Sequence, residues 1–226
     1  MHENAVQVYE AVKTVAPNVF IIYSDSGPIE PFGSFHNTIR RPDHLLWEDK
    51  FQTCLKHCGD NWLLVIHADC HCERWDVVAK RCLKVISEIQ TLGVWAPKIE
   101  GTFYNLSATA LVSKKDSPIH LVALTDAIVF SLSPEIVERM RRLTFGHNPH
   151  GWGIDLLFCS SAHAQNKLVV IDEHVEVQHP KARGYETAEA ERGMQRFLSQ
   201  FSMRERMMCT LLRTYVHSKH MAQKLR

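Results

Sequence analysis

The chain has 226 residues, 45% of them hydrophobic and 23% charged, which is the balance of a soluble globular protein able to bury a large core. The formal net charge of +1 gives the protein no strong overall electrostatic field, so we expect no nucleic-acid partner. Seven cysteines, an odd number in a long chain, argue against a secreted disulfide framework, and no stretch has the composition of a signal peptide or a membrane span. We therefore expect a cytoplasmic protein in which most thiols are buried.

The first hundred residues alternate between predicted helices and strands. Short apolar runs bounded by turn residues are typical of buried strands, and apolar residues three or four positions apart are typical of helices. The expected elements are a weak helix over residues 2–14, a strand over 19–23, a loop over 28–44, a helix over 45–58, a strand over 62–66, a helix over 73–92 and a strand over 93–97. This order predicts an α/β fold with a parallel sheet and right-handed crossovers.

Polar side chains follow the strand over residues 62–66 directly, beginning with His67 and Asp69. Ligands of open α/β sheets bind beyond the carboxyl ends of strands, so this is a candidate site for a metal or a phosphate. If the extended backbone continues past residue 66, the two side chains point the same way. The alternative is that Asp69 only caps the following helix. Asp25 follows the earlier strand in the same manner.

The second half of the chain has a different order of elements. We expect extended segments over residues 106–112 and 119–131, helices over 133–143 and 154–163, strands over 167–171 and 174–178, and helices from residue 186 onward. Asp126 lies among apolar residues, and a buried acid needs hydrogen-bond partners, so it is either a structural centre or a ligand contact. Asp155 could simply occupy the first turn of its helix, where the helix dipole favours an acidic residue. His179 could simply end its strand.

The order of these features resembles that of nucleotide-sugar-dependent glycosyltransferases of the GT-A fold, of the inverting, family-2-like kind, over roughly residues 18–185. The markers are an early nucleotide-binding strand, a strand ending in an Asp-x-Asp-like motif, a strand leading into a Ser-Pro-Glu helix, the stretch Gly-Trp-Gly-Ile-Asp at 151–155, and a late strand ending in Gln-His-Pro at 178–180. The stretch at 151–155 is the most specific marker. The resemblance implies a single Rossmann-like GT-A domain with a mainly parallel, mixed central sheet and a C-terminal helical appendage.

The same resemblance implies transfer of a sugar from a nucleotide-diphosphate donor to a hydroxyl acceptor. A Mn²⁺ or Mg²⁺ ion would neutralise the leaving diphosphate, with Asp69 and His179 as its ligands. Asp155 matches the general base that takes the acceptor proton in inverting members. The residues implied in nucleotide or sugar binding are Asp25, His67 and Asp126.

Two departures from the family pattern leave other functions open. His67 stands where the first acid of the Asp-x-Asp motif is usual, and Tyr-Ser-Asp-Ser at 23–26 replaces the commoner Pro-x-Tyr-Asn form. An imidazole can ligate Mn²⁺ or donate to a hydroxyl, but it is not equivalent to a carboxylate. The alternatives are a GT-A-like module that binds without turnover and a nucleotidyltransferase. The lack of a Gly-rich basic phosphate loop after the first strand counts against the second alternative.

We expect a glycosyltransferase-like domain over residues 1–185, with a nucleotide-binding half over 1–100 and an acceptor half over 101–185, and a helical tail over 186–226. In the tail, apolar residues recur at helical spacing over 203–216, and basic residues, Arg226 among them, outnumber acidic ones. This stripe could pack on the domain or on a second copy of the chain. Alternatively, it could lie on the inner face of an anionic membrane, near a lipid-linked acceptor or a surface glycan.

Overall fold

The computed structural model describes residues 2–33, 35, 37–114, 116–180 and 186–224. Its centre is a six-stranded sheet in the order β3-β7-β4-β8-β6-β5. These strands are β3 (Leu63–Ile66), β4 (Leu92–Glu100), β5 (Ala110–Val112), β6 (Ile119–Val122), β7 (Val129–Leu132) and β8 (Leu168–Gln178). Since β7 and β6 run antiparallel to their neighbours while β4 and β8 pair in parallel, the other four strands share one direction. The expected α/β class with a mainly parallel, mixed sheet is confirmed.

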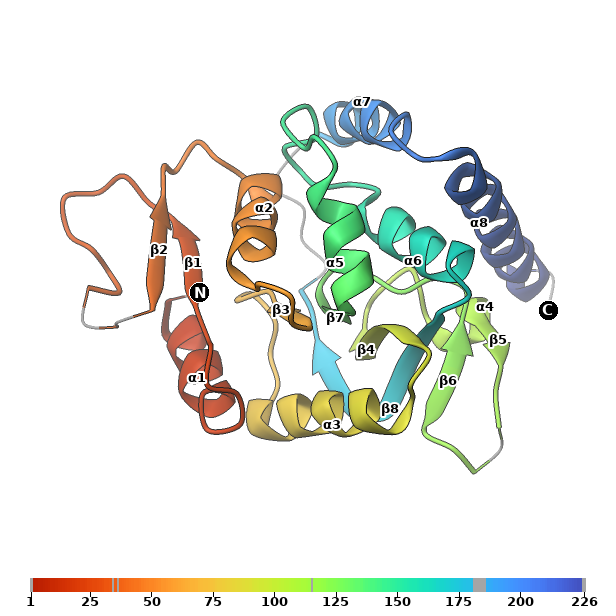
Figure 1. Cartoon of the computed structure of the whole chain (residues 1–226), viewed down its shortest axis with the longest axis horizontal. Coiled ribbons are helices and arrows are strands. Elements are labelled where there is room, and N and C mark those ends of the chain that lie inside the picture. Colours follow the sequence, from red (N-terminus) through yellow and green to blue (C-terminus); the bar gives the residue numbers. More distant parts are fainter. Residues whose placement is uncertain (1, 34, 36, 115, 181–185, 225–226) are drawn as a thin grey trace.

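Helices cover both faces of this sheet (Figure 1). They are α1 (His2–Val12), α2 (Trp47–His57), α3 (Trp75–Glu88), the short α4 (Leu106–Thr109), α5 (Pro134–Arg141), α6 (Ile154–Ala164), α7 (Thr187–Leu198) and α8 (Met203–Lys224). One apolar core lies between the sheet and α1 and α3, and includes Trp75 and Trp95. The other lies between the sheet and α2, α5 and α6, and includes Phe51, Phe130 and Phe158. The tail helix α8 packs on the outer side of α6.

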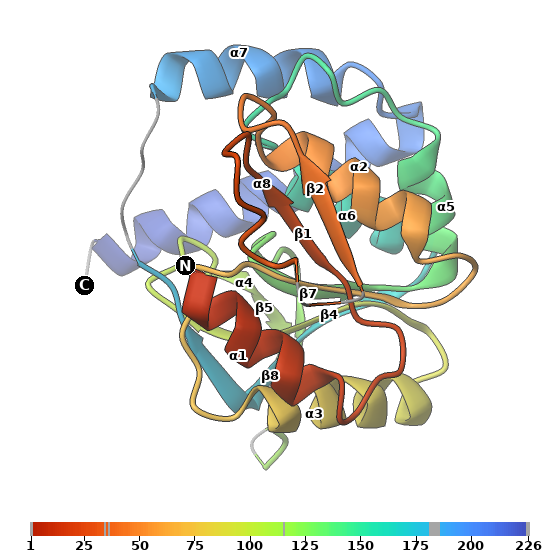
Figure 2. The same cartoon turned by 90° about the vertical axis from the view of Figure 1, so that its left-hand side faces the viewer.

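The first strand does not join the central sheet, contrary to the expectation from the sequence. Instead β1 (Ile21–Ser24) and β2 (Thr38–Arg41) form a separate parallel pair, which Figure 2 shows in front of α2. The apolar run has only one buried residue within the strand, Ile21, and Phe20 is 41% exposed. The loop predicted over 28–44 contains β2. This strand was not predicted, because its two arginines interrupt the apolar pattern of a buried strand. Arg41 in β2 is held by a bidentate ion pair with Asp49.

The bounds of several other strands differ from those predicted from the sequence. The extended segment over 119–131 is two strands, β6 and β7, separated by a loop over 123–128. The two late strands are one continuous strand, β8, in which Asp172 is tolerated because Arg81 of α3 donates two hydrogen bonds to it, at 2.8 and 3.0 Å. β3 lies at one end of the sheet, so its residues alternate between buried and partly buried.

The tail is helical as expected, with a break at residues 199–202 between α7 and α8. The boundary at 185 and the basic residue Arg226 lie outside the described residues. Among the described helices, none is both long enough and apolar enough to cross a bilayer.

Candidate functional site

The segment after β3 turns away from the sheet as soon as the strand ends. β3 stops at Ile66, and residues 68–69 form a turn, so the condition under which the His67 and Asp69 side chains would point the same way is not met. His71 then pairs with Gln178 in an isolated antiparallel bridge, in which each backbone N–H donates to the other carbonyl over 2.9 Å. The side chain of Asn4 in α1 donates to the carbonyls of Ala68 and Cys70. These contacts fix the turn against the end of β8.

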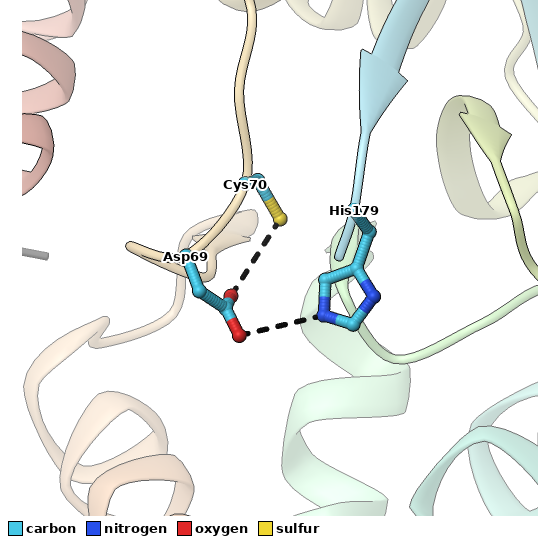
Figure 3. A group of neighbouring side chains, drawn as sticks. All are labelled: Asp69, Cys70 and His179. Carbon is cyan, nitrogen blue, oxygen red and sulfur yellow. Dashed lines mark hydrogen bonds and ion pairs between the residues drawn. The ribbon is translucent and has the colours of Figure 1, made fainter. Parts of the chain in front are cut away.

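The turn and the end of β8 bring three potential metal ligands together (Figure 3). Oδ2 of Asp69 lies 3.4 Å from Nε2 of His179, and Sγ of Cys70 lies 3.9 Å from Oδ1 of Asp69. The ligand atoms of the three residues all lie within 4.8 Å of one another. The Asp69 side chain is 40% exposed and that of His179 is 25% exposed, so this Asp69–Cys70–His179 cluster is open to a ligand. The sequence prediction that Asp69 and His179 share one sheet edge agrees with this arrangement.

A surface hollow adjoins the cluster on the side of β4. Its volume is about 290 Å³, and it is lined by His71, Glu100, Gly101, Gln178, His179 and Pro180. His179 therefore belongs both to the cluster and to the wall of the hollow. A small polar group bound in the hollow would lie directly against the imidazole ring of His179.

The residues of the cluster suit a divalent cation. A carboxylate oxygen and an imidazole nitrogen are ligands that Mn²⁺ accepts readily. His67 lies beside the cluster, and its Nε2 atom is buried without a hydrogen-bond partner. Burial lowers the pKa of His67 to about 4, so the ring is neutral near pH 7. Burial also raises the pKa of the Cys70 thiol well above its usual range, which leaves Asp69 and His179 as the candidate ligands for a hard cation.

The His67 ring packs against the side chain of Trp47, which Gly151 of a separate loop also contacts. Trp47, the first residue of α2, packs edge to face on His67 with the ring centroids 4.1 Å apart. Gly151 has φ +70° and lies against the same indole, where a Cβ atom would overlap Cδ1 of Trp47. Both the backbone conformation and the contact thus require glycine at this position. The Gly-Trp-Gly loop and the turn after β3 are therefore packed through one tryptophan.

Asp155 lies in the first turn of α6, as predicted, but the helix dipole does not dominate its titration. Burial and the negative charge of Asp126 raise the pKa of Asp155 to about 7. Hydrogen bonds from the backbone N–H of Leu156 and the hydroxyl of Tyr104 act in the opposite direction. Because the first two effects are larger, this carboxyl group exchanges a proton near neutral pH.

Asp126 connects Asp155 electrostatically with the metal-type cluster. Its charge raises the pKa of Asp155 and also that of Cys70. Its carboxylate accepts hydrogen bonds from the Thr102 hydroxyl over 2.6 Å and from the Ala127 backbone over 2.9 Å. Asp126 is thus a hydrogen-bond centre whose charge acts on both Asp155 and Cys70, and its role as a sugar contact stays a prediction.

Asp25 has a different setting from the other candidates. Its carboxylate accepts hydrogen bonds from Arg40 over 3.0 Å and from the Gly27 backbone over 2.9 Å, all within the β1–β2 unit. The Arg40 Nε atom also donates to the Asp25 carbonyl over 2.9 Å. The pairing with Arg40 is one that the sequence did not suggest, and nucleotide binding by Asp25 stays a prediction.

Two residues of the site were missed in the sequence. The position of Cys70 next to Asp69 could have indicated a member of the site. Buried thiols are common, however, and Cys70 was predicted to be one of them. Tyr104 is in an irregular segment between β4 and α4, where no periodicity marks a side chain that reaches α6. Its contact with Asp155 depends entirely on tertiary packing.

Neither the protein-family models nor the curated proteins contain a match to this chain. Among solved structures, UDP-glucose pyrophosphorylase complexed with UDP-glucose is 13% identical, with 72% of this chain and 66% of that chain covered and a TM-score of 0.42. Apo UDP-glucose pyrophosphorylase is 14% identical over 73% and 64%, with a TM-score of 0.43. The chain thus spans about two thirds of the length of these two structures.

A third structure covers more of the chain. CMP:2-keto-3-deoxy-manno-octonic acid synthetase complexed with CTP is 12% identical over 88% of both chains, with a TM-score of 0.46. At these identities the similarities concern the arrangement of strands and helices. The assignment of a function therefore starts from the residues of the site.

Proposed function

We propose that this protein is a glycosyltransferase that moves a sugar from a nucleotide-diphosphate donor to a hydroxyl acceptor. The observation that carries the proposal is the joint presence of a cation-type cluster, Asp69–Cys70–His179, and a second carboxyl group, Asp155, with the charge of Asp126 acting on both Cys70 and Asp155. Sugar transfer needs charge neutralisation at the departing diphosphate and a base at the acceptor. The cluster would supply the charge neutralisation, and Asp155 would supply the base.

The first group acts on the donor. Asp69 and His179 would hold a divalent cation, Mn²⁺ or Mg²⁺, which offsets the negative charge of the leaving nucleotide diphosphate. The neutral ring of His67, whose buried Nε2 atom has no hydrogen-bond partner among the described residues, would donate to, or accept from, a donor hydroxyl group. Under this proposal His67 binds the donor in place of the usual acid. The proposal extends to Asp25 as a contact of the nucleotide and to Asp126 as a contact of the sugar.

The second group acts on the acceptor. The ionised carboxylate of Asp155 takes the proton of the acceptor hydroxyl while that oxygen forms a bond to the anomeric carbon. The bond from the anomeric carbon to the diphosphate oxygen breaks, and its electron pair leaves with the diphosphate. The proton then passes from Asp155 to solvent. Tyr104 keeps the carboxylate oriented through its hydrogen bond.

The position of these residues also favours two functional halves. Asp69 comes from residues 1–100, the proposed nucleotide-binding half, whereas Asp155 and His179 come from residues 101–185, the proposed acceptor half. A site built from both halves places the donor and the acceptor side by side. Residues 186–226 add no side chain to this site under the proposal.

A titratable base favours sugar transfer over nucleotidyl transfer. In nucleotidyl transfer to a sugar phosphate, the nucleophile is a phosphate oxygen that is already an anion, so no proton has to be removed from it. A hydroxyl acceptor carries a proton that must leave, and Asp155 exchanges its proton near neutral pH. The carboxyl group therefore favours glycosyl transfer over nucleotidyl transfer to a sugar phosphate.

The test is product analysis with the full chain, a panel of nucleotide-diphosphate sugars and mixed hydroxyl acceptors, with and without Mn²⁺. Sugar transfer releases a nucleoside diphosphate, and it should depend on Asp69 and Asp155. Formation of a nucleoside triphosphate and a sugar phosphate from nucleotide sugar and pyrophosphate would instead assign nucleotidyl transfer. Donor binding without any product would assign a non-catalytic module, and either of these results would overturn the proposal.

A further inference from the structure

Helix α8 has two apolar faces, of which only one is covered by the rest of the protein. Cys209, Leu212 and Val216 are buried and belong to the core that α6 shares. On the opposite side, Met203 is 70% exposed, Met207 62% and Leu211 64%. These three residues follow one another at intervals of four and form an exposed apolar stripe. Met221, farther along the same side, is 46% exposed.

The single stripe expected from the sequence is therefore divided. One part packs on the domain, which was the first alternative. The other part, Met203–Met207–Leu211, faces solvent in the monomer. Large apolar side chains that are exposed singly are ordinary, but three in consecutive helical turns form a continuous surface that usually has a binding role.

The exposed side of α8 is also strongly basic. The helix has five basic residues, all exposed: Arg204, Arg206, Arg213, Lys219 and Lys224. Within the described part of the chain, none of the five forms an ion pair with an acidic residue. Lys219 lies over the ring of Tyr215, 5.5 Å from its centroid. The whole chain has a net charge of only +1, so this positive charge is local to the helix.

The one acidic residue of α8 does not neutralise this surface. The Glu205 side chain is 5% exposed and points into the protein, where Arg139 of α5 donates to both of its carboxylate oxygens over 2.7 and 2.8 Å. The outer side of the helix therefore presents apolar and basic side chains without an acidic one.

The basic residues border the apolar stripe. Arg206, Arg213 and Lys224 lie along one edge of it, because their spacings of seven and eleven residues return to the same side of a helix. Arg204 lies at the other edge, next to Leu211. Arginine and lysine in such positions can keep the charged end at a polar surface while the alkyl part lies along an apolar one.

We propose that α8 binds flat on the surface of an anionic membrane, with Met203, Met207 and Leu211 directed into the acyl boundary and the flanking basic residues at the headgroups. An apolar stripe edged by basic residues is the arrangement found in helices that lie in the interface plane. Each basic residue near an anionic surface strengthens binding by about fivefold. A second copy of the chain fits less well, because its α8 would bring the same positive edges against these.

The test uses the full chain and vesicles of phosphatidylglycerol mixed with phosphatidylcholine, compared with vesicles of phosphatidylcholine alone. The protein should sediment with the anionic vesicles at low salt and be released as the salt concentration rises. The double variant Met207→Gln/Leu211→Gln should bind at least about tenfold more weakly. The double variant Arg206→Gln/Arg213→Gln should lose about 25-fold on anionic vesicles.

The matched control is Leu83→Gln, which changes an exposed leucine on α3, 47% exposed, on the other side of the sheet. It should bind vesicles like the parent protein. All replaced side chains are exposed, and circular dichroism of each variant confirms that the fold is kept. Sedimentation velocity without lipid shows whether the stripe joins two copies.

Three results would overturn the proposal: no binding to anionic vesicles, equal binding by the Met207→Gln/Leu211→Gln variant, or a dimer in solution that this variant dissolves. None of these measurements depends on turnover. A failure of the membrane proposal is therefore distinguishable from a failure of the proposed glycosyltransferase activity.

Discussion

The hydroxyl group of Tyr104 donates a hydrogen bond to the carboxylate of Asp155, which joins the segment after β4 to the first turn of α6. This hydrogen bond lowers the pKa of Asp155, whereas burial and the charge of Asp126 raise it, to about 7. Two neighbours therefore act on the titration of one carboxyl group in opposite directions. Their separate effects can be measured.

Tyr104→Phe should shift the acidic limb of the pH–rate profile to higher pH. Loss of the hydroxyl donor raises the pKa of Asp155, and the base acts only when ionised, so more alkaline conditions are needed for full activity. A hydrogen bond to a charged group is worth enough to move the limb by about one pH unit. Steady-state rates between pH 5 and pH 9 would show the shift, and Tyr9→Phe in α1 serves as the control.

Asp126→Asn should move the same limb in the opposite direction. Removal of the nearby negative charge favours ionisation of Asp155, so its pKa falls and activity persists to lower pH. The asparagine can still accept from the Ala127 backbone, which preserves the local turn. If both variants shift the limb the same way, or neither shifts it, Asp155 is not the group that titrates.

Asp155→Asn should slow the chemical step by about 10²–10⁴-fold with donor affinity almost unchanged, because a general base contributes that much. Single-turnover rates and donor titrations would separate the two quantities. A variant that binds the donor poorly but keeps its rate would make Asp155 a binding residue instead.

The same substitution should stabilise the protein at alkaline pH. The folded-state pKa of Asp155, about 7, lies above its ordinary value of 3.8, so the folded protein holds a proton that the unfolded chain releases. The free energy of unfolding therefore falls as pH rises from about 4 to about 7, and stays flat above that. Asp155→Asn removes this loss and should gain on the order of 2 kcal/mol at pH 8, with little gain at pH 4. Urea denaturation at both pH values is the measurement.

Asp69→Asn should abolish the binding of Mn²⁺, since an amide oxygen is a weaker ligand for a hard cation than a carboxylate. Isothermal titration calorimetry would detect the loss without any assay of turnover. The matched control is Asp60→Asn, whose side chain is fully exposed and remote from the cluster. Equal Mn²⁺ affinity in the parent protein and Asp69→Asn would exclude Asp69 as a ligand.

Glu205→Gln should loosen the attachment of α8 in a pH-dependent manner. Burial would raise the pKa of Glu205, but hydrogen bonds from Arg139 and Ser202 prevail and lower it to about 2. The stabilisation is therefore complete above the unfolded value of about 4.3 and is lost as pH falls toward 2. At pH 7 the variant should lose about 2 kcal/mol, a figure that allows for solvent screening of a partly exposed pair.

Denaturation at pH 7 and at pH 3 would test this expectation, because the difference between the parent protein and Glu205→Gln should narrow at the lower pH. Glu138→Gln is the control, since this side chain is 52% exposed and its ion pairs with Arg141 and Arg142 lie at the surface. Its effect should stay below about 1 kcal/mol at both pH values. A constant difference for Glu205→Gln would mean that the carboxylate charge does not hold the helix.

The sequence predicted those parts of the fold that depend on local pattern. The apolar run before His67 became β3, and the amphipathic stretch over 73–92 became α3, because periodicity and burial coincide there. It did not reveal β2, whose arginines pair with Asp25 and Asp49, carboxylates that no periodicity of the sequence connects with them. It also placed β1 in the central sheet, since an apolar run does not say which neighbour will accept it.

The candidate site was predictable where a polar residue follows a strand. Asp69 and His179 both follow strands of the same sheet, and the structure brings them to 3.4 Å. Tyr104 and Cys70 were not identified, because their roles depend on side-chain packing between segments that no sequence rule connects. A shared direction of the His67 and Asp69 side chains was predicted only for an extended backbone beyond Ile66, whereas Asp69 lies in a turn.

The bridge between His71 and Gln178 determines when the candidate site can form during synthesis of the chain. The first half of the chain leaves the ribosome with Asp69 and Cys70 but without His179, which follows the last strand. Domains acquire long-range pairings only after the later segment has been synthesised, and such pairings form slowly. A nascent chain therefore cannot bring the proposed cation ligands together until β8 has docked, and the candidate site forms only when nearly the whole sheet is assembled.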